Sequence, residues 1–211
     1  MSDFSLWANF QDRIGFFTKE TASRIPERPG VYGWFFPLYL YSCDLDDFVE
    51  LVSNLLNYDA SCQSVPHQNA EMMFNWDSIQ ISATRRRSGV VTDEMRRGWD
   101  KIFSSDEELP LLSQALMESS IFLPPLYVGR ATNLKERYHQ HAEQPNLEKN
   151  TFATRFAKHA SNAGLNIEVC DLLFVCVFTE RDAGEILRSK VVNGVLEQVL
   201  MRLSAPPFSV R

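Results

Sequence analysis

Three short apolar runs constrain the fold more than any other feature of the chain. The longest, residues 172–178 (LLFVCVF), has the length and the β-branched and aromatic content of a central β-strand. Residues 31–36 and 121–129 have a similar composition, with proline and glycine in or beside them. None of the three approaches the roughly 20 residues that a membrane-spanning helix needs. We therefore expect a small sheet in a protein without a membrane span.

Segments with helical periodicity separate these runs and predict the helices that would cover such a sheet. Predicted helices occupy residues 4–17, 44–58, 92–103, 105–120, 150–164 and 182–203, and one more follows Gly129. Residues 59–69 are polar and predict a loop, whereas residues 77–87 alternate like an edge strand. The resulting order predicts an α+β fold, with a small mixed or antiparallel sheet flanked by helices and a large, mostly helical insertion.

The net charge of −6 is distributed unevenly along the chain. Residues 34–124 hold 14 acidic and 6 basic residues, a net charge of −8. Residues 1–33 hold four of each and are neutral, and residues 125–211 hold 9 acidic and 11 basic residues, a net charge of +2. The acidic total therefore does not exclude a polyanionic partner for the C-terminal half.

The four cysteines have neither the density of a disulfide-stabilised scaffold nor a CxxC spacing. The first 13 residues, MSDFSLWANFQDR, lack the basic start, the apolar run and the small-residue cleavage site of a signal peptide. These features predict a reduced, cytoplasmic protein.

Several short motifs stand in a fixed order along the chain: GVY at 30–32, YVG at 127–129, Arg137 and His141 on the helix that follows, Glu197 on the last helix, and PPFS at 206–209. Arg137 and His141 are four residues apart, so they project from one face of their helix. Taken singly, each motif is common: the tyrosines would be ordinary strand residues, and the charged residues would lie on solvated helix faces. Their joint order is what points to a site.

This set of motifs resembles that of the GIY-YIG nucleases, with valine in place of isoleucine in each triplet. The resemblance covers residues 25–36 and 123–211, and the helix with arginine and histidine at 150–164 is most similar to the restriction-endonuclease branch. It implies a metal-dependent endonuclease of restriction or defence type that hydrolyses phosphodiester bonds of double-stranded DNA. It also implies a nuclease core, residues 1–36 and 123–211, interrupted by an acidic subdomain at 37–122.

The residues implied as catalytic are Tyr32, Tyr127, Arg137, His141 and Glu197. Glu197 would be the oxygen ligand of Mg²⁺ or Mn²⁺, and the forked Arg137 guanidinium would hold the phosphate. The resemblance assigns Tyr32 as general base, a role that a phenol with a pKa near 10 fills poorly at neutral pH. We therefore expect His141 to take the Tyr32 proton, with Tyr127 and the field of the metal stabilising the phenolate.

Other basic residues are candidates for contacts with the DNA backbone. Arg130, directly behind the YVG triplet, is expected to face the DNA. Arg155, Lys158 and His159 share one predicted helix, where a DNA-binding role and an ordinary solvated face are both open. The basic cluster at 85–101 would either touch DNA or form a solvated turn.

Two departures from the family pattern leave the function open to an alternative. The triplets are separated by the acidic insertion, which would contact a protein partner, mediate a homodimer or shield the site. Ser209 stands where the family usually has an asparagine, and a hydroxyl cannot replace an amide as both donor and acceptor in the same geometry. The alternative is a catalytically weakened module that acts as a protein-interaction or nucleic-acid-binding subunit of a larger complex. A nuclease for repair or mobile elements would share the chemistry and differ in its substrate.

Overall fold

The computed structural model describes residues 13–56, 67–74, 77–84, 91–142, 151–162, 165–179, 186–204 and 206–208. The strands are β1 (Ile14–Phe17), β2 (Gly30–Phe35), β3 (His67–Phe74), β4 (Asp77–Thr84), β5 (Tyr127–Ala131) and β6 (Leu173–Phe178). The α-helices are α2 (Leu45–Leu56), α3 (Asp93–Phe103), α4 (Glu108–Ser119), α5 (Leu134–Ala142), α6 (Phe152–Asn162) and α7 (Ile186–Ser204). Short 3₁₀ turns are η2 (Lys19–Arg24), η3 (Ser120–Phe122) and η4 (Val169–Asp171). None of the described helices has the length and apolar character needed to cross a membrane.

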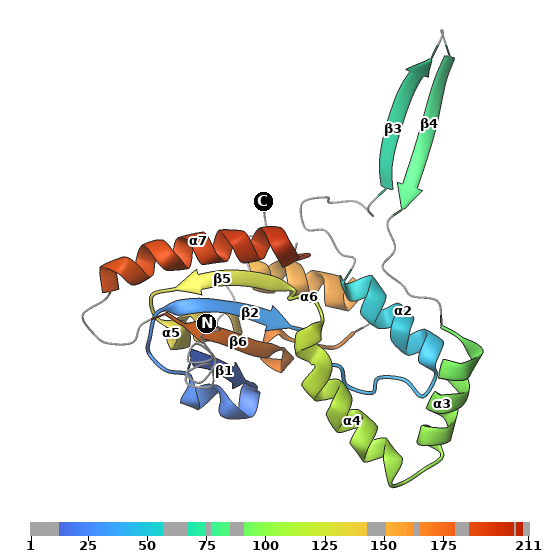
Figure 1. The fold of residues 1–211 in the computed structure, drawn as a ribbon, viewed down its shortest axis with the longest axis horizontal. Coiled ribbons are helices and arrows are strands. Elements are labelled where there is room, and N and C mark those ends of the chain that lie inside the picture. Colours follow the sequence, from blue (N-terminus) through green and yellow to red (C-terminus); the bar gives the residue numbers. More distant parts are fainter. Residues whose placement is uncertain are drawn as a thin grey trace, which may run out of the picture.

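The main sheet has four strands in the order β1-β6-β2-β5, and every neighbouring pair is antiparallel. The two apolar runs that contain β2 and β6 lie in its middle, as their composition predicts. Figure 1 shows α7 running beside β5, with α2, α3 and α4 grouped at one end of the sheet. These features confirm the α+β class and show that this sheet is antiparallel.

Two predictions about local structure are wrong. The last residues of the helix predicted at 4–17 form β1, whose Ile14–Phe17 pairs with β6. Isoleucine and phenylalanine favour strands, Gly15 disfavours a helix, and the pairing covers an otherwise open edge of an apolar strand. The loop predicted at 59–69 also ends early, because residues 67–69 belong to β3 and pair with β4. Backbone pairing with β4 outweighs the weak strand preference of these polar residues.

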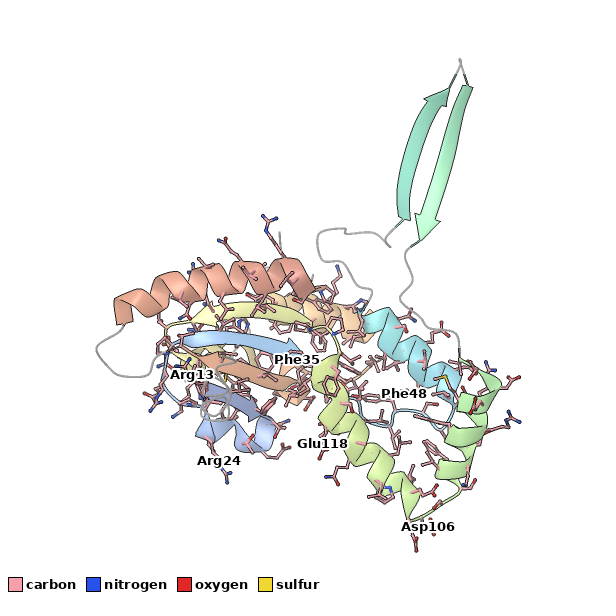
Figure 2. The ribbon with its side chains drawn as sticks, viewed as in Figure 1. Arg13, Arg24, Phe35, Phe48, Asp106 and Glu118 are labelled. Carbon is pink, nitrogen blue, oxygen red and sulfur yellow. The ribbon has the colours of Figure 1, made fainter. Side chains whose placement is uncertain are left out.

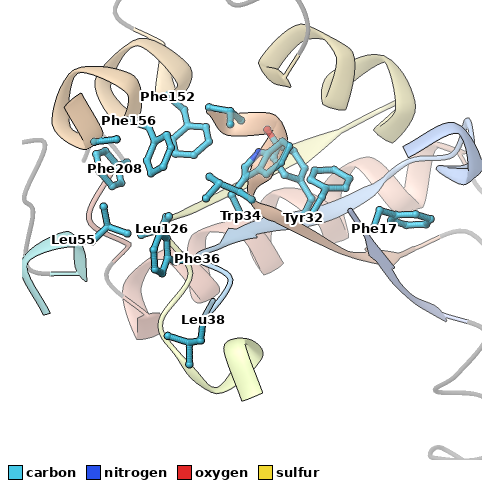
Figure 3. Close-up of a cluster of buried hydrophobic side chains, with 14 of the residues drawn as sticks. Phe17, Tyr32, Trp34, Phe36, Leu38, Leu55, Leu126, Phe152, Phe156 and Phe208 are labelled. Carbon is cyan, nitrogen blue, oxygen red and sulfur yellow. The ribbon is translucent and has the colours of Figure 1, made fainter. Parts of the chain in front are cut away.

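The core is built on the face of β2 that carries Tyr32 and Trp34. Trp34 is fully buried, and its ring packs on Phe174 of β6 at 4.8 Å between centroids, on Tyr138 of α5 at 5.4 Å and on Phe152 of α6 at 6.1 Å. Figure 3 shows the aromatic side chains of this cluster extending from Tyr32 past Trp34 to Phe152. Aromatic contacts of this kind add to the burial of apolar area. They fix α5 and α6 against the sheet.

The segment 37–122 contains α2, α3 and α4 together with the antiparallel β3–β4 hairpin, which extends away from the other elements in Figure 1. Its helices share one continuous apolar cluster with the sheet, which includes Phe48 and Trp99. The backbone N–H of Leu38 donates to Ser120 Oγ at 2.9 Å, and Trp99 Nε1 donates to the carbonyl of Cys43 at 2.8 Å. Apolar packing therefore holds these helices to the sheet, and the two hydrogen bonds connect parts of the segment with each other.

Acidic side chains of this segment face solvent. Asp106 and Glu118 are exposed around α4, whereas Phe48 of α2 is buried (Figure 2). Asp46 pairs with Arg96 at 2.7 Å on the surface, where solvent screens the interaction. These acids thus lie on the surface of the segment, while its apolar side chains join the core.

Candidate functional site

The pairing of β2 with β5 brings the two motif tyrosines together. Tyr32 lies opposite Gly129, and Trp34 lies opposite Tyr127, so both tyrosine side chains belong to one face of the sheet. Their ring centroids are 6.1 Å apart. Only glycine fits at position 129, because a Cβ there would lie 2.6 Å from the Tyr32 hydroxyl oxygen and 2.8 Å from Cε1 of Tyr127. The glycine of the YVG triplet thus makes room for both rings.

Helix α5 places His141 against these tyrosines. The Tyr32 hydroxyl lies 3.0 Å from His141 Nε2, a hydrogen bond between residues 109 positions apart in the sequence. Tyr32 is 2% exposed and His141 8% exposed. The His141 ring also lies 5.8 Å from that of Tyr127 and meets Phe152 edge-on at 5.8 Å. Aromatic packing therefore fixes the imidazole in the orientation that the hydrogen bond requires.

Burial sets the protonation states of this pair. It raises the pKa of Tyr32 well above the ordinary value of 10, and the nearby Tyr127 adds to that rise. The pKa of His141 is lowered to about 4, mainly by burial and also by the positive charges of Arg137 and Arg155. At neutral pH the phenol is therefore protonated and the imidazole is neutral. When His141 carries its proton on Nδ1, Nε2 accepts the hydrogen bond from the Tyr32 hydroxyl.

Transfer of a proton from Tyr32 to His141 would be strongly unfavourable in the protein alone. The raised pKa makes the Tyr32 phenol a weaker acid, and the lowered pKa makes the His141 imidazole a weaker base. The nearby carboxylate of Glu197 contributes in the same direction, since it raises the pKa of Tyr32 and of Tyr127. The guanidinium of Arg137 opposes this effect at both tyrosines. Positive charge added beside Glu197 would make the phenolate easier to form.

Arg137 and Glu197 approach the tyrosines from different helices. Arg137 lies one turn before His141 on α5, and its Nη1 donates to Gln140 Oε1 at 3.0 Å. Glu197 lies on α7, and its Oε2 is 3.0 Å from Nε of Arg130 on β5. The charges of Arg137 and Glu197 are both close enough to shift the pKa of each tyrosine. The structure thus brings Tyr32, Tyr127 and His141 into contact, with the charges of Arg137 and Glu197 near enough to act on both tyrosines.

The donor atoms at this site fit a hydrated hard cation better than a fully protein-bound metal. Glu197 is the acidic residue whose charge acts on both tyrosines, and its side chain is 20% exposed. Within the described part of the chain, no three or more His, Cys, Asp or Glu residues gather in a way that could hold a metal ion. Mg²⁺ keeps several waters and is commonly bound through one or two carboxylates, a pattern that a single glutamate can satisfy.

The residues predicted to bind DNA occupy different environments. Arg130 is half-exposed and paired with Glu197, and Lys158 is exposed on α6. Arg155 Nη2 donates to the carbonyl of Phe208 at 2.7 Å, and the His159 ring lies 5.6 Å from that of Phe208. Arg155 and His159 therefore fasten the segment after α7 to α6. Ser209 and the residues 85–90 of the predicted basic cluster lie outside the described residues.

Sequence reasoning missed two residues of α7 next to the carboxylate. Gly194, one turn before Glu197, faces Arg130, whose Nη1 would lie 2.6 Å from a Cβ at this position. Asn193 is 3% exposed, which is unusual for an amide side chain. The glycine in the middle of a long helix is the sequence signal that could have indicated a close approach.

Comparison with known proteins found no matching family model, no matching curated protein and no matching solved structure.

Proposed function

We propose that the chain is a metal-dependent DNA endonuclease of GIY-YIG type that hydrolyses phosphodiester bonds of double-stranded DNA in restriction or defence. The observation that carries this proposal is the hydrogen bond between the buried Tyr32 and His141, in contact with Tyr127 and within the electrostatic reach of Arg137 and Glu197. Paired tyrosines, a neutral histidine, a cation and a carboxylate supply the parts that hydrolysis of a phosphodiester needs.

Each residue has a role that follows from its place. Arg137 binds the non-bridging oxygens of the scissile phosphate with its forked guanidinium. Tyr32 accepts a proton from the attacking water as the oxygen of that water bonds to phosphorus and the bond to the leaving oxygen breaks. His141 orients the Tyr32 oxygen through the 3.0 Å hydrogen bond and receives the proton that the phenol must lose beforehand. Glu197 would hold Mg²⁺ or Mn²⁺, which would supply positive charge that favours the phenolate and offsets the charge of the phosphate.

A plasmid-nicking assay tests this function. Purified protein is incubated with supercoiled DNA and Mg²⁺ or Mn²⁺, and we expect Tyr32→Phe and Glu197→Ala each to lower the nicking rate by at least about a hundredfold. Tyr39→Phe and Glu118→Ala are matched controls, because both residues are exposed and lie outside the site. Nicking by Glu197→Ala at the wild-type rate would exclude the mechanism.

The ion pair between Arg130 and Glu197 favours one alternative, a catalytically weakened subunit that binds nucleic acid or a protein. In that case Arg130 neutralises the carboxylate permanently, and the segment 37–122 with its exposed acids binds a partner. The same assay separates the two functions. Absence of nicking with either metal, together with co-purification of one partner protein, would favour the subunit. For the nuclease, a second copy of the chain would supply the site that cuts the complementary strand.

A further inference from the structure

The side chain of Arg130 on β5 lies against α7 at Gly194, where the helix has no side chain. Its Nε is 3.0 Å from Oε2 of Glu197, and its Nη1 occupies the space where a side chain at position 194 would begin, 2.6 Å from an ideal Cβ. Side chains alternate along a strand, so Arg130 leaves β5 on the face opposite to Tyr127. The guanidinium therefore reaches Glu197 by passing over Gly194.

Gly194 is needed for this arrangement and is otherwise unfavourable where it stands. It lies in the interior of α7, where glycine is worse than alanine for helix stability. Gly98 in α3 is a useful contrast, because nothing lies within 4 Å of an added Cβ there. The absence of a side chain at 194 keeps the Arg130 guanidinium close to the carboxylate.

We propose that Arg130 is a counter-ion that substrate displaces: it holds Glu197 when DNA is absent, and a DNA phosphate that binds its guanidinium frees the carboxylate for a divalent cation. This inference rests on the proposed function and adds a positioning residue to it. A guanidinium and a divalent cation carry charge of the same sign and compete for Glu197, so each weakens the binding of the other.

Exposure and geometry allow the exchange. The Arg130 side chain is 49% exposed, so a phosphate can reach it without unfolding any element. Arginine binds phosphate through the same fork that binds a carboxylate. A phosphate that takes over Arg130 removes the competitor for Glu197, so phosphate and cation bind cooperatively. By linkage, each must then strengthen the binding of the other by the same factor.

Mn²⁺ binding to the full chain tests the proposal without relying on cleavage. Free Mn²⁺ is measured by electron paramagnetic resonance in titrations of wild-type protein, Arg130→Ala, Gly194→Ala and Gly98→Ala, all without DNA. We expect the dissociation constant for Mn²⁺ to fall about threefold in Arg130→Ala and Gly194→Ala, the size expected for loss of a partly exposed ion pair, and to be unchanged in Gly98→Ala. Gly194→Ala should fold, because its new Cβ meets only the flexible end of Arg130.

A second titration includes a short DNA duplex, with Tyr32→Phe added to every protein to prevent cutting. The duplex should tighten Mn²⁺ binding when Arg130 is present and should have no such effect in Arg130→Ala. Unchanged Mn²⁺ affinity in Arg130→Ala and Gly194→Ala, or no detectable Mn²⁺ binding by either variant, would overturn this inference. The proposed function would still stand if the wild-type protein nicks DNA. If the wild-type protein neither nicks DNA nor loses Mn²⁺ binding on Glu197→Ala, the proposed function fails and this inference falls with it.

Discussion

At the scale of single residues, burial makes Tyr32 a weaker acid and His141 a weaker base than either would be in water. The hydrogen bond between them is therefore well formed and yet passes no proton until the charge around it changes. In the proposed nuclease, such a pair would stay inactive until a cation and a phosphate bind. The same burial makes the protein sensitive to acid.

His141 predicts a loss of stability between pH 6.5 and pH 4. The unfolded chain binds a proton at this histidine near its ordinary pKa of 6.5, whereas the folded protein binds it only near pH 4. Between these values the unfolded state holds more protons, so lowering the pH favours unfolding, and stability that is complete above pH 6.5 falls until about pH 4. At pH 5 the loss from this residue is about 2 kcal/mol.

Urea unfolding of wild-type protein and His141→Gln at pH 7 and pH 5 measures this loss. Glutamine does not titrate, so the variant should lose about 2 kcal/mol less than the wild type over this interval. The carboxylates that titrate in the same range are shared by both proteins and cancel in the comparison. An equal loss in the two proteins would show that His141 is not protonated on unfolding.

At the scale of elements, α6 carries one arginine that makes a structural contact and one exposed lysine. Arg155 is bonded to the Phe208 carbonyl, whereas Lys158 is exposed. We predict that Arg155→Ala lowers the free energy of unfolding by about 2 kcal/mol through loss of a charged hydrogen bond. Lys158→Ala should change the free energy of unfolding by no more than about 0.5 kcal/mol. It should also make the slope of log K for DNA binding against log salt concentration shallower by about one.

Denaturant unfolding and a salt series of DNA-binding titrations distinguish these two effects. Lys158→Ala with an unchanged salt slope would remove this residue from the DNA contacts. Arg155→Ala with unchanged stability would mean that the bond to Phe208 contributes nothing to holding the segment after α7.

Hydrophobic periodicity was sufficient to predict most elements but not their ends. Helices α2, α3 and α6 end within two residues of the predicted ranges, whereas α4 and α7 begin three and four residues after their predicted starts; all five have an amphipathic pattern. Strands β2, β5 and β6 follow the apolar runs. Ile14–Phe17 misled the prediction because its apolar residues also satisfy helical spacing, and only pairing with β6 decides in favour of a strand. Tertiary contacts override local preference in such short segments.

At the scale of the whole molecule, motif order was enough to name three residues that are in contact, Tyr32, Tyr127 and His141, but not the geometry of that contact. Tyr32, Tyr127, Arg137, His141 and Glu197 were chosen from motif order, and the antiparallel pairing of β2 with β5 brings the tyrosines into contact. The Arg130–Glu197 pair could not be predicted, because it depends on the distance between a strand and a helix far apart in the sequence. Burial of His141, which sets its pKa, likewise depends on packing from three elements.

In the proposed mechanism, a scissile phosphate and a divalent cation meet between the tyrosine pair and Glu197. A crystal structure of Tyr32→Phe with a DNA duplex and Mn²⁺, with anomalous diffraction data, tests it most directly. We predict a manganese peak bonded to Glu197, with one DNA phosphate between it and the Arg137 guanidinium and with Arg130 turned from the carboxylate to the DNA. A duplex bound elsewhere, with Arg130 still paired to Glu197 and no manganese peak beside it, would exclude this arrangement.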